Sequence, residues 1–220
     1  DIGGDVVDAA FSPDGSALAT ASGDGQVKFF QVYLHEEGPL RCLHQWSPHG
    51  GKPLSCLFFL DDHSSHQPDV QYWKYAVTGC SLNTELKVWS CESWTCLQTI
   101  SFNRVGEDMG VRLKADLDPT ARYLVLADID KCLVFVLSVE QGVEGGAMVV
   151  SVAEFATPSP ILSFGCVSAG KRMVKQTAEG VEVSVEEDMI ENNDKQEKTV
   201  VRLFFVQPKS LQECSIIYDD

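Results

Sequence analysis

Short apolar runs alternate with turn residues over the first thirty positions of the chain. The order of runs and turns is 6–11, Asp14-Gly15, 16–21, Asp24-Gly25 and 26–32. Proline before the first turn presets φ, and glycine accepts the positive φ that tight turns require. Short runs joined by such turns are typical of antiparallel strands. The pattern predicts a three-stranded meander over 6–32, with Phe29 and Phe30 in its core.

A five-residue unit with an aromatic ring at its third position recurs along the chain. Its copies lie at 28–32, 87–91, 133–137 and 202–206. The rings that we expect to anchor the core of each copy are Phe30, Trp89, Phe135 and Phe204. Repeats of roughly 40–45 residues with four strands each are the propeller pattern. The copies are spaced more widely than that, so the sequence predicts an all-β propeller with insertions.

Two stretches resemble WD40 repeats. They read "FSPDGSALATASGDGQVKFFQV" over 11–32 and "TGCSLNTELKVWS" over 78–90, although the Trp-Asp pair itself never appears. His49 resembles the structural histidine of this family, which bonds within a blade to an aspartate in a turn. By the same resemblance, Asp24 takes the place of that aspartate in the first blade and Asn83 takes it in the second. These side chains are expected to fix turns and not to bind a ligand.

Residues 11–30, 73–89 and 109–135 resemble a more specific family. These segments are similar to the N-terminal propeller of the scaffold proteins of the metazoan mRNA-decapping complex. The resemblance implies a non-catalytic scaffold that joins the decapping enzyme to its activator and promotes 5′ cap removal. It also implies cytoplasmic processing bodies, with the nucleus as a further location. The alternative is a generic WD40 adaptor, such as a ubiquitin-ligase substrate receptor or a trafficking subunit.

The repeats divide the chain into four modules. We expect blades at about 1–45, 46–105, 106–155 and 156–220, with an acidic flexible insertion at about 168–198. Four modules are fewer than the seven usual in the family, so we expect a partial arc truncated from a larger propeller. A complete small ring is the alternative. The insertion is interpreted as a mobile surface loop, or as an acidic docking motif around Met189-Ile190.

The net charge of the chain disfavours some classes of binding partner. Seventeen basic residues stand against 32 acidic ones, which gives a formal net charge of −15. This charge disfavours nucleic acid, because phosphates need a basic footprint, and it disfavours anionic membrane surfaces. The densest basic group, Lys171, Arg172 and Lys175, lies beside the acidic insertion. We therefore expect protein partners and no direct binding of nucleic acid or membrane; the oligomeric state stays open.

No motif in the sequence predicts an enzyme. The chain lacks a glycine-flanked nucleophile elbow and a phosphate-binding loop, since the glycines of 142–146 have no Lys-Ser/Thr after them. His63 and His66 stand near Asp61 without a second ligand pair, so no metal or cofactor is expected. The eight cysteines lie mostly in apolar runs and are interpreted as free thiols. Three tryptophans at module edges are candidates for partner contact: Trp46, Trp73 and Trp94.

Overall fold

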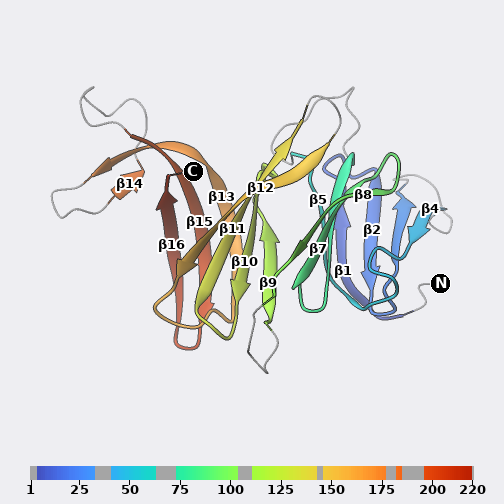
Figure 1. Cartoon of the computed structure of the whole chain (residues 1–220), viewed down its shortest axis with the longest axis horizontal. Helices are drawn as coiled ribbons and strands as arrows, with labels where there is room; N and C mark the ends of the chain where they lie inside the picture. Colours follow the sequence, from blue (N-terminus) through green and yellow to red (C-terminus); the bar gives the residue numbers. More distant parts are fainter. Residues whose placement is uncertain are drawn as a thin grey trace.

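The chain forms four antiparallel sheets of four strands each. In the computed structural model, the described residues are 4–32, 41–62, 73–103, 111–142, 146–176, 182–184 and 196–219. The sheets stand side by side in sequence order and form an open arc (Figure 1). The predicted all-β fold is confirmed. No helix of the described residues is both long and apolar enough to cross a bilayer.

The first three sheets follow the chain order of their strands. The first contains β1 (Val6–Phe11), β2 (Ala17–Ser22), β3 (Val27–Gln31) and β4 (Arg41–Trp46). The second contains β5 (Leu54–Phe59), β6 (Tyr75–Cys80), β7 (Glu85–Ser90) and β8 (Thr95–Ser101). The third contains β9 (Leu113–Leu117), β10 (Tyr123–Asp128), β11 (Leu133–Gln141) and β12 (Ala147–Ala156). Strand β1 contacts β5, and β9 contacts β13, whereas the second and third sheets also meet through β12, which contacts β7 and β8.

The fourth sheet differs from the others in its strand order. It contains β13 (Ser163–Gln176), β14 (Glu182–Ser184), β15 (Gln196–Gln207) and β16 (Ser210–Tyr218), in the order β14-β13-β15-β16. The structure differs from the flexible insertion expected at 168–198 at the residues that lie in β13; residues 177–181 and 185–195 lie outside the described residues. Residues 168–174 pair with β15, because apolar side chains such as Val174 and Val200 bury themselves along the ladder. The docking motif around Met189-Ile190 lies outside the described residues.

Three apolar clusters hold the arc together, one between each pair of neighbouring sheets. The first includes Phe29, Leu57 and Phe59; the second includes Leu86, Val88, Leu126 and Leu137; the third includes Val134, Val136, Leu203 and Phe205. Each sheet thus covers one face of the next, which is how repeat proteins bury a core. Strand β10, YLVLAD, is buried at every position because it has clusters on both faces.

The recurring rings do not all occupy the core. Trp89 and Phe135 are buried, as predicted, and each faces the preceding sheet. Phe30 is only half-buried, because no sheet is described on that side of the first blade. In each of the first three copies, the residue one position before the ring is fully buried: Phe29, Val88 and Val134.

The fourth copy is shifted by one residue. Phe204 is 43% exposed, whereas Leu203 and Phe205 pack against the third sheet. Side chains alternate across a strand, so a one-residue shift in alignment moves a ring to the opposite face. The expectation that Phe204 anchors the core was wrong for this reason. The apolar residues Phe204 and Val206 face the open end of the arc.

Gly25 joins the first two sheets through a close backbone approach. Its φ is +83°, and a Cβ at this position would lie 2.6 Å from the carbonyl carbon of Gly51. We expect Gly25→Ala to lower the free energy of unfolding by about 3 kcal/mol, because it adds a backbone clash to the cost of positive φ. Urea denaturation measures the loss.

Gly15 provides the matched control. Its φ is +69°, but nothing lies within 4 Å of the position that a Cβ would take. Gly15→Ala should therefore cost only the backbone strain of about 1 kcal/mol. Equal losses for the two variants would contradict the close approach.

Candidate interaction site

A buried hydrogen-bond chain organises the second sheet around His49. The ring sits in the turn before β5, and its Nδ1 lies 2.8 Å from Oε1 of Glu85 at the start of β7. Its Nε2 lies 3.0 Å from the Thr78 hydroxyl on β6. The Trp89 indole N–H donates to the same hydroxyl at 2.9 Å. One histidine thereby fixes a turn against two strands of its sheet.

The direction of each hydrogen bond in the His49 network follows from the ionisation of Glu85. An ionised carboxylate only accepts, so Nδ1 of His49 carries the proton and Nε2 accepts from Thr78. Burial lowers the pKa of His49, which keeps the ring neutral at pH 7. Hydrogen bonds from His49 and Lys52 lower the pKa of Glu85 to about 2. The result is a structural network in which each of these polar groups has a hydrogen-bond partner.

The two residues given the place of the turn aspartate behave differently. In the first blade, Asp24 accepts from the Ser22 hydroxyl and from the Gln26 N–H and so closes its own turn. In the second blade, Asn83 does not hydrogen-bond His49, contrary to expectation. Its amide donates to the carbonyl of Leu113 at 3.0 Å and thus ties the second sheet to the third. The longer side chain of Glu85 takes the position that the resemblance had given to Asn83.

The three tryptophans at module edges share one cluster. Trp46, Trp73 and Trp94 are partly buried and pack around Phe29 between the first two sheets. The ring of His44 stacks on Trp94 with centroids 3.8 Å apart. Burial of this much aromatic surface accounts for the cluster as a joint between sheets. A role in partner contact remains a prediction.

The structure brings three groups with metal-ligand chemistry together. Ligand atoms of His49, Cys80 and Glu85 lie within 4.8 Å of one another. Both ring nitrogens of His49 already have hydrogen-bond partners, and Lys52 Nζ lies 3.0 Å from Glu85. A bound cation would have to compete with these interactions for its ligand atoms. His63 and His66 lie outside the described residues.

Asp61 is a buried carboxylate in which only one of the two oxygens has a hydrogen-bond partner among the described residues. It is 7% exposed; Oδ1 accepts the Lys74 N–H, and Oδ2 has no hydrogen-bond partner among the described residues. Burial raises the pKa of Asp61 to about 6. The folded state therefore binds this proton more tightly than the unfolded state does.

This burial predicts an increase in stability as the pH falls from above 6 towards 4. Two pKa units correspond to about 3 kcal/mol, gained as Asp61 becomes neutral in the folded state. Asp61→Asn should remove that part of the pH dependence and raise stability at pH 7. Urea midpoints of both proteins at pH 4.5 and pH 7.0 test this. The same pH dependence in both proteins would be the opposing result.

The basic group on the fourth sheet does not form an isolated patch. Lys171, Arg172 and Lys175 lie on β13, and Arg172 pairs in register with Lys198 on β15. Lys198 lies 3.5 Å from Asp219. The absence of direct nucleic-acid binding stays a prediction.

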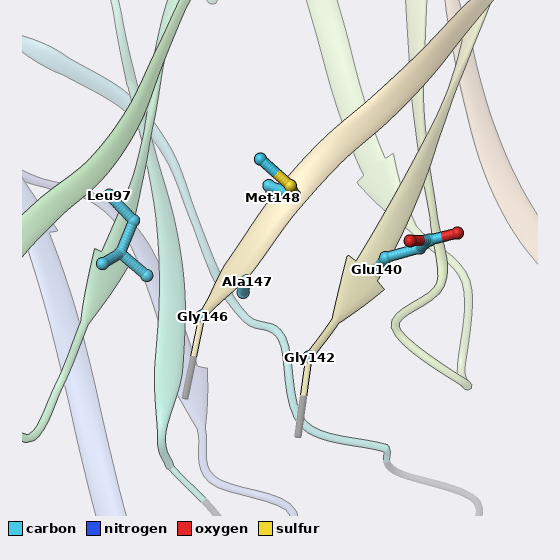
Figure 2. A pocket seen from close by; sticks show the side chains of 6 residues that line it. All are labelled: Leu97, Glu140, Gly142, Gly146, Ala147 and Met148. Carbon is cyan, nitrogen blue, oxygen red and sulfur yellow. The ribbon is translucent and has the colours of Figure 1, made fainter. Parts of the chain in front are cut away.

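A hollow of about 350 Å³ opens between β8 and the β11–β12 hairpin. It is lined by Leu97, Glu140, Gly142, Gly146, Ala147 and Met148. Figure 2 shows Leu97 on one wall and Met148 on the other, with the two glycines at the end of the hairpin. This β8–β12 hollow is mainly apolar and is the candidate contact site for a partner.

Sequence reasoning found the histidine of the buried network but missed Thr78 and Glu85, which it bonds. It also missed the β8–β12 hollow. The glycines at 142 and 146 close a hairpin connection, since Gly142 N–H bonds the Gly146 carbonyl at 2.8 Å. The apolar run over 148–152, beside these glycines, was the signal that could have indicated an exposed strand.

Comparison with solved structures places the arc among WD40 domains. The WD40 domain of Toxoplasma gondii coronin superposes with a TM-score of 0.61 at 13% identity, covering 98% of this chain and 46% of that one. The WD40 domain of SCAP from fission yeast gives 0.54 at 14% identity, covering 97% and 45%. At these identities the likeness concerns the fold alone.

Sequence comparison is more specific. Enhancer of mRNA-decapping protein 4 of Danio rerio is 40% identical over 219 residues, which are 96% of this chain and 16% of that protein. The Homo sapiens protein of the same name is 40% identical over 94% of this chain. The Drosophila melanogaster homolog is 38% identical over 96%. The chain thus spans about one sixth of the length of these relatives.

A family model described as the WD40 region of Ge1, enhancer of mRNA-decapping protein, matches residues 2–144. The match covers the first two sheets and most of the third. Together with the four-stranded blades, it decides which family the fold represents. The chain belongs to the family of Ge1 WD40 regions.

Proposed function

We propose that this chain is a non-catalytic interaction scaffold that promotes 5′ cap removal in cytoplasmic mRNA decay. The observation that carries the proposal is the match to the Ge1 WD40 region, whose description names an enhancer of decapping. The scaffold brings the decapping enzyme and its activator together. Processing bodies are the proposed location. The acidic charge of −15 favours protein partners over RNA.

The geometry supports a scaffold better than an enzyme. The buried polar groups around His49 satisfy one another, and the exposed apolar groups lie at the sheet edges and the β8–β12 hollow. Rigid sheets that present loops and edges are suited to binding. We further propose that additional blades of the longer protein cover the apolar faces that carry Phe30 and Phe204.

Co-precipitation of the full-length protein from cells tests the function. The scaffold predicts that the decapping enzyme and its activator are recovered together, and that recovery falls when the segment equivalent to this chain is deleted. Recovery of ubiquitin-ligase or trafficking subunits without decapping proteins would support the generic adaptor instead. RNase treatment is the control, because partners bridged by RNA would be lost.

A further inference from the structure

Strand β12 carries more exposed apolar surface than the fourth strand of any other sheet. Met148, Val150 and Val152 are 52%, 46% and 51% exposed. Strands β4, β8 and β16 each expose a single large apolar side chain: Leu43, Leu97 and Leu211. Contiguous exposed apolar surface on a folded protein marks sites of interaction. The exposed side chains along β12 therefore form an apolar edge that is a candidate surface for a partner.

The β8–β12 hollow lies at one end of this apolar edge. Its walls come from both strands, since Leu97 belongs to β8 and Met148 to β12. The hairpin is held against the second sheet by the Gln98 amide, which accepts from the Val149 N–H at 2.7 Å and donates to its carbonyl at 3.1 Å. In Figure 1 this hairpin rises in yellow beyond the sheets. The two bonds keep the walls apart at a fixed separation.

The charged side chains of the described parts of the β11–β12 hairpin are all acidic. Strands β11 and β12 contain Glu140 and Glu154 and no lysine, arginine or histidine. Glu140 lines the hollow and pairs in register with Met148, while Glu154 stands two residues beyond Val152. Arg122 lines an adjoining hollow together with Glu140. An apolar edge between two carboxylates is complementary to an apolar segment with basic flanks.

We propose that the β8–β12 hollow and the exposed side chains of β12 bind an extended peptide in which apolar residues alternate with lysine or arginine. One apolar side chain enters the hollow between Leu97 and Met148, and the next ones lie along Val150 and Val152. A basic side chain at each end meets Glu140 or Glu154. Because the Gln98 amide already bonds the backbone N–H and carbonyl of Val149, side-chain contacts carry the binding at this residue, and the hollow gives specificity. The inference rests on the proposed scaffold function and gives it a specific contact surface.

A lysine-leucine peptide of alternating sequence is the probe that tests the site directly. Titration into the full chain labelled with ¹³C at its methionine methyl groups should shift the Met148 signal. Replacing the lysines by glutamate should weaken binding at least about tenfold, because like charges oppose docking. Replacing the leucines by serine should abolish it. At about 1 mM peptide, binding with a dissociation constant in the millimolar range is detectable. An unchanged Met148 signal at that concentration would overturn the proposal.

Substitution at Gly146 closes the hollow without straining the fold. Nothing lies within 4 Å of the position that its Cβ would take, and its φ is outside the positive range. Gly146→Leu and Met148→Ser should each weaken the peptide about tenfold, and Glu140→Lys about fivefold. The matched controls, Leu211→Ser and Glu92→Lys, change an exposed leucine and an exposed glutamate elsewhere and should stay within about twofold. Equal effects in controls and test variants would reject the site.

Failure of peptide binding can be distinguished from failure of the proposed scaffold function. Absence of peptide binding, with the decapping enzyme still recovered by the full-length protein, rejects the hollow and leaves the scaffold. Peptide binding without recovery of decapping proteins rejects the scaffold and leaves the hollow. Loss of enzyme recovery in the full-length Gly146→Leu protein would support both together.

Discussion

Replacing Phe205 by alanine is expected to lower the free energy of unfolding by about 3–5 kcal/mol, whereas Phe204→Ala should cost less than about 1 kcal/mol. Phe205 is 3% exposed and packs between the third and fourth sheets, and Phe204 is 43% exposed at the open end. A cavity forms only at the buried position. Urea denaturation of the two variants, monitored by circular dichroism, measures the difference.

Phe204→Ala and Phe205→Ala are matched controls for each other, because both variants lose the same side chain at adjacent positions. Similar losses would mean that β15 is shifted by one residue from the register observed. In a longer protein with further blades, we expect the cost of Phe204→Ala to rise towards that of Phe205→Ala. That rise would indicate that another blade packs against the open end that carries Phe204.

Removal of His49 is the second change expected to have a large effect. His49→Ala should lower the free energy of unfolding by about 3 kcal/mol, because it opens a cavity, removes the acceptor of the Thr78 hydroxyl and removes the donor to Glu85 Oε1. Thermal and urea unfolding measure the loss. His49→Gln, which can restore one hydrogen bond, should recover part of it.

Lys52→Ala is the matched control at the same carboxylate. Lys52 Nζ lies 3.0 Å from Oε2 of Glu85, but its side chain is 55% exposed. An exposed ion pair contributes at most about 1 kcal/mol. If Lys52→Ala and His49→Ala had equal effects, the buried network would not be what fixes the turn before β5.

The fold was predictable from sequence because its signals are local. Turns such as Asp24-Gly25 and the strand alternation around them are set by backbone chemistry within a few residues. The resemblance to WD40 repeats then gave the arrangement of sheets. The exposure of Phe30 could not be predicted from its own strand, since it depends on whether another sheet lies beside the first.

The candidate site was less predictable because it depends on contacts between sheets. The Gln98 amide meets Val149 across 51 positions of the chain, and Leu97 meets Met148 over a similar span. The replacement of Asn83 by Glu85 beside His49 depends on how far each side chain reaches, which repeat alignment does not show. The shift at Phe204 arose because adjacent phenylalanines offer two equally aromatic alignments.

The rate of 5′ cap release in the presence of the full-length protein tests the central claim most directly. The account predicts that deleting the segment equivalent to this chain slows cap release by the decapping enzyme, and that the purified chain alone releases no cap. An unchanged rate after the deletion, or cap release by the chain without the enzyme, would contradict a scaffold that acts through its surface.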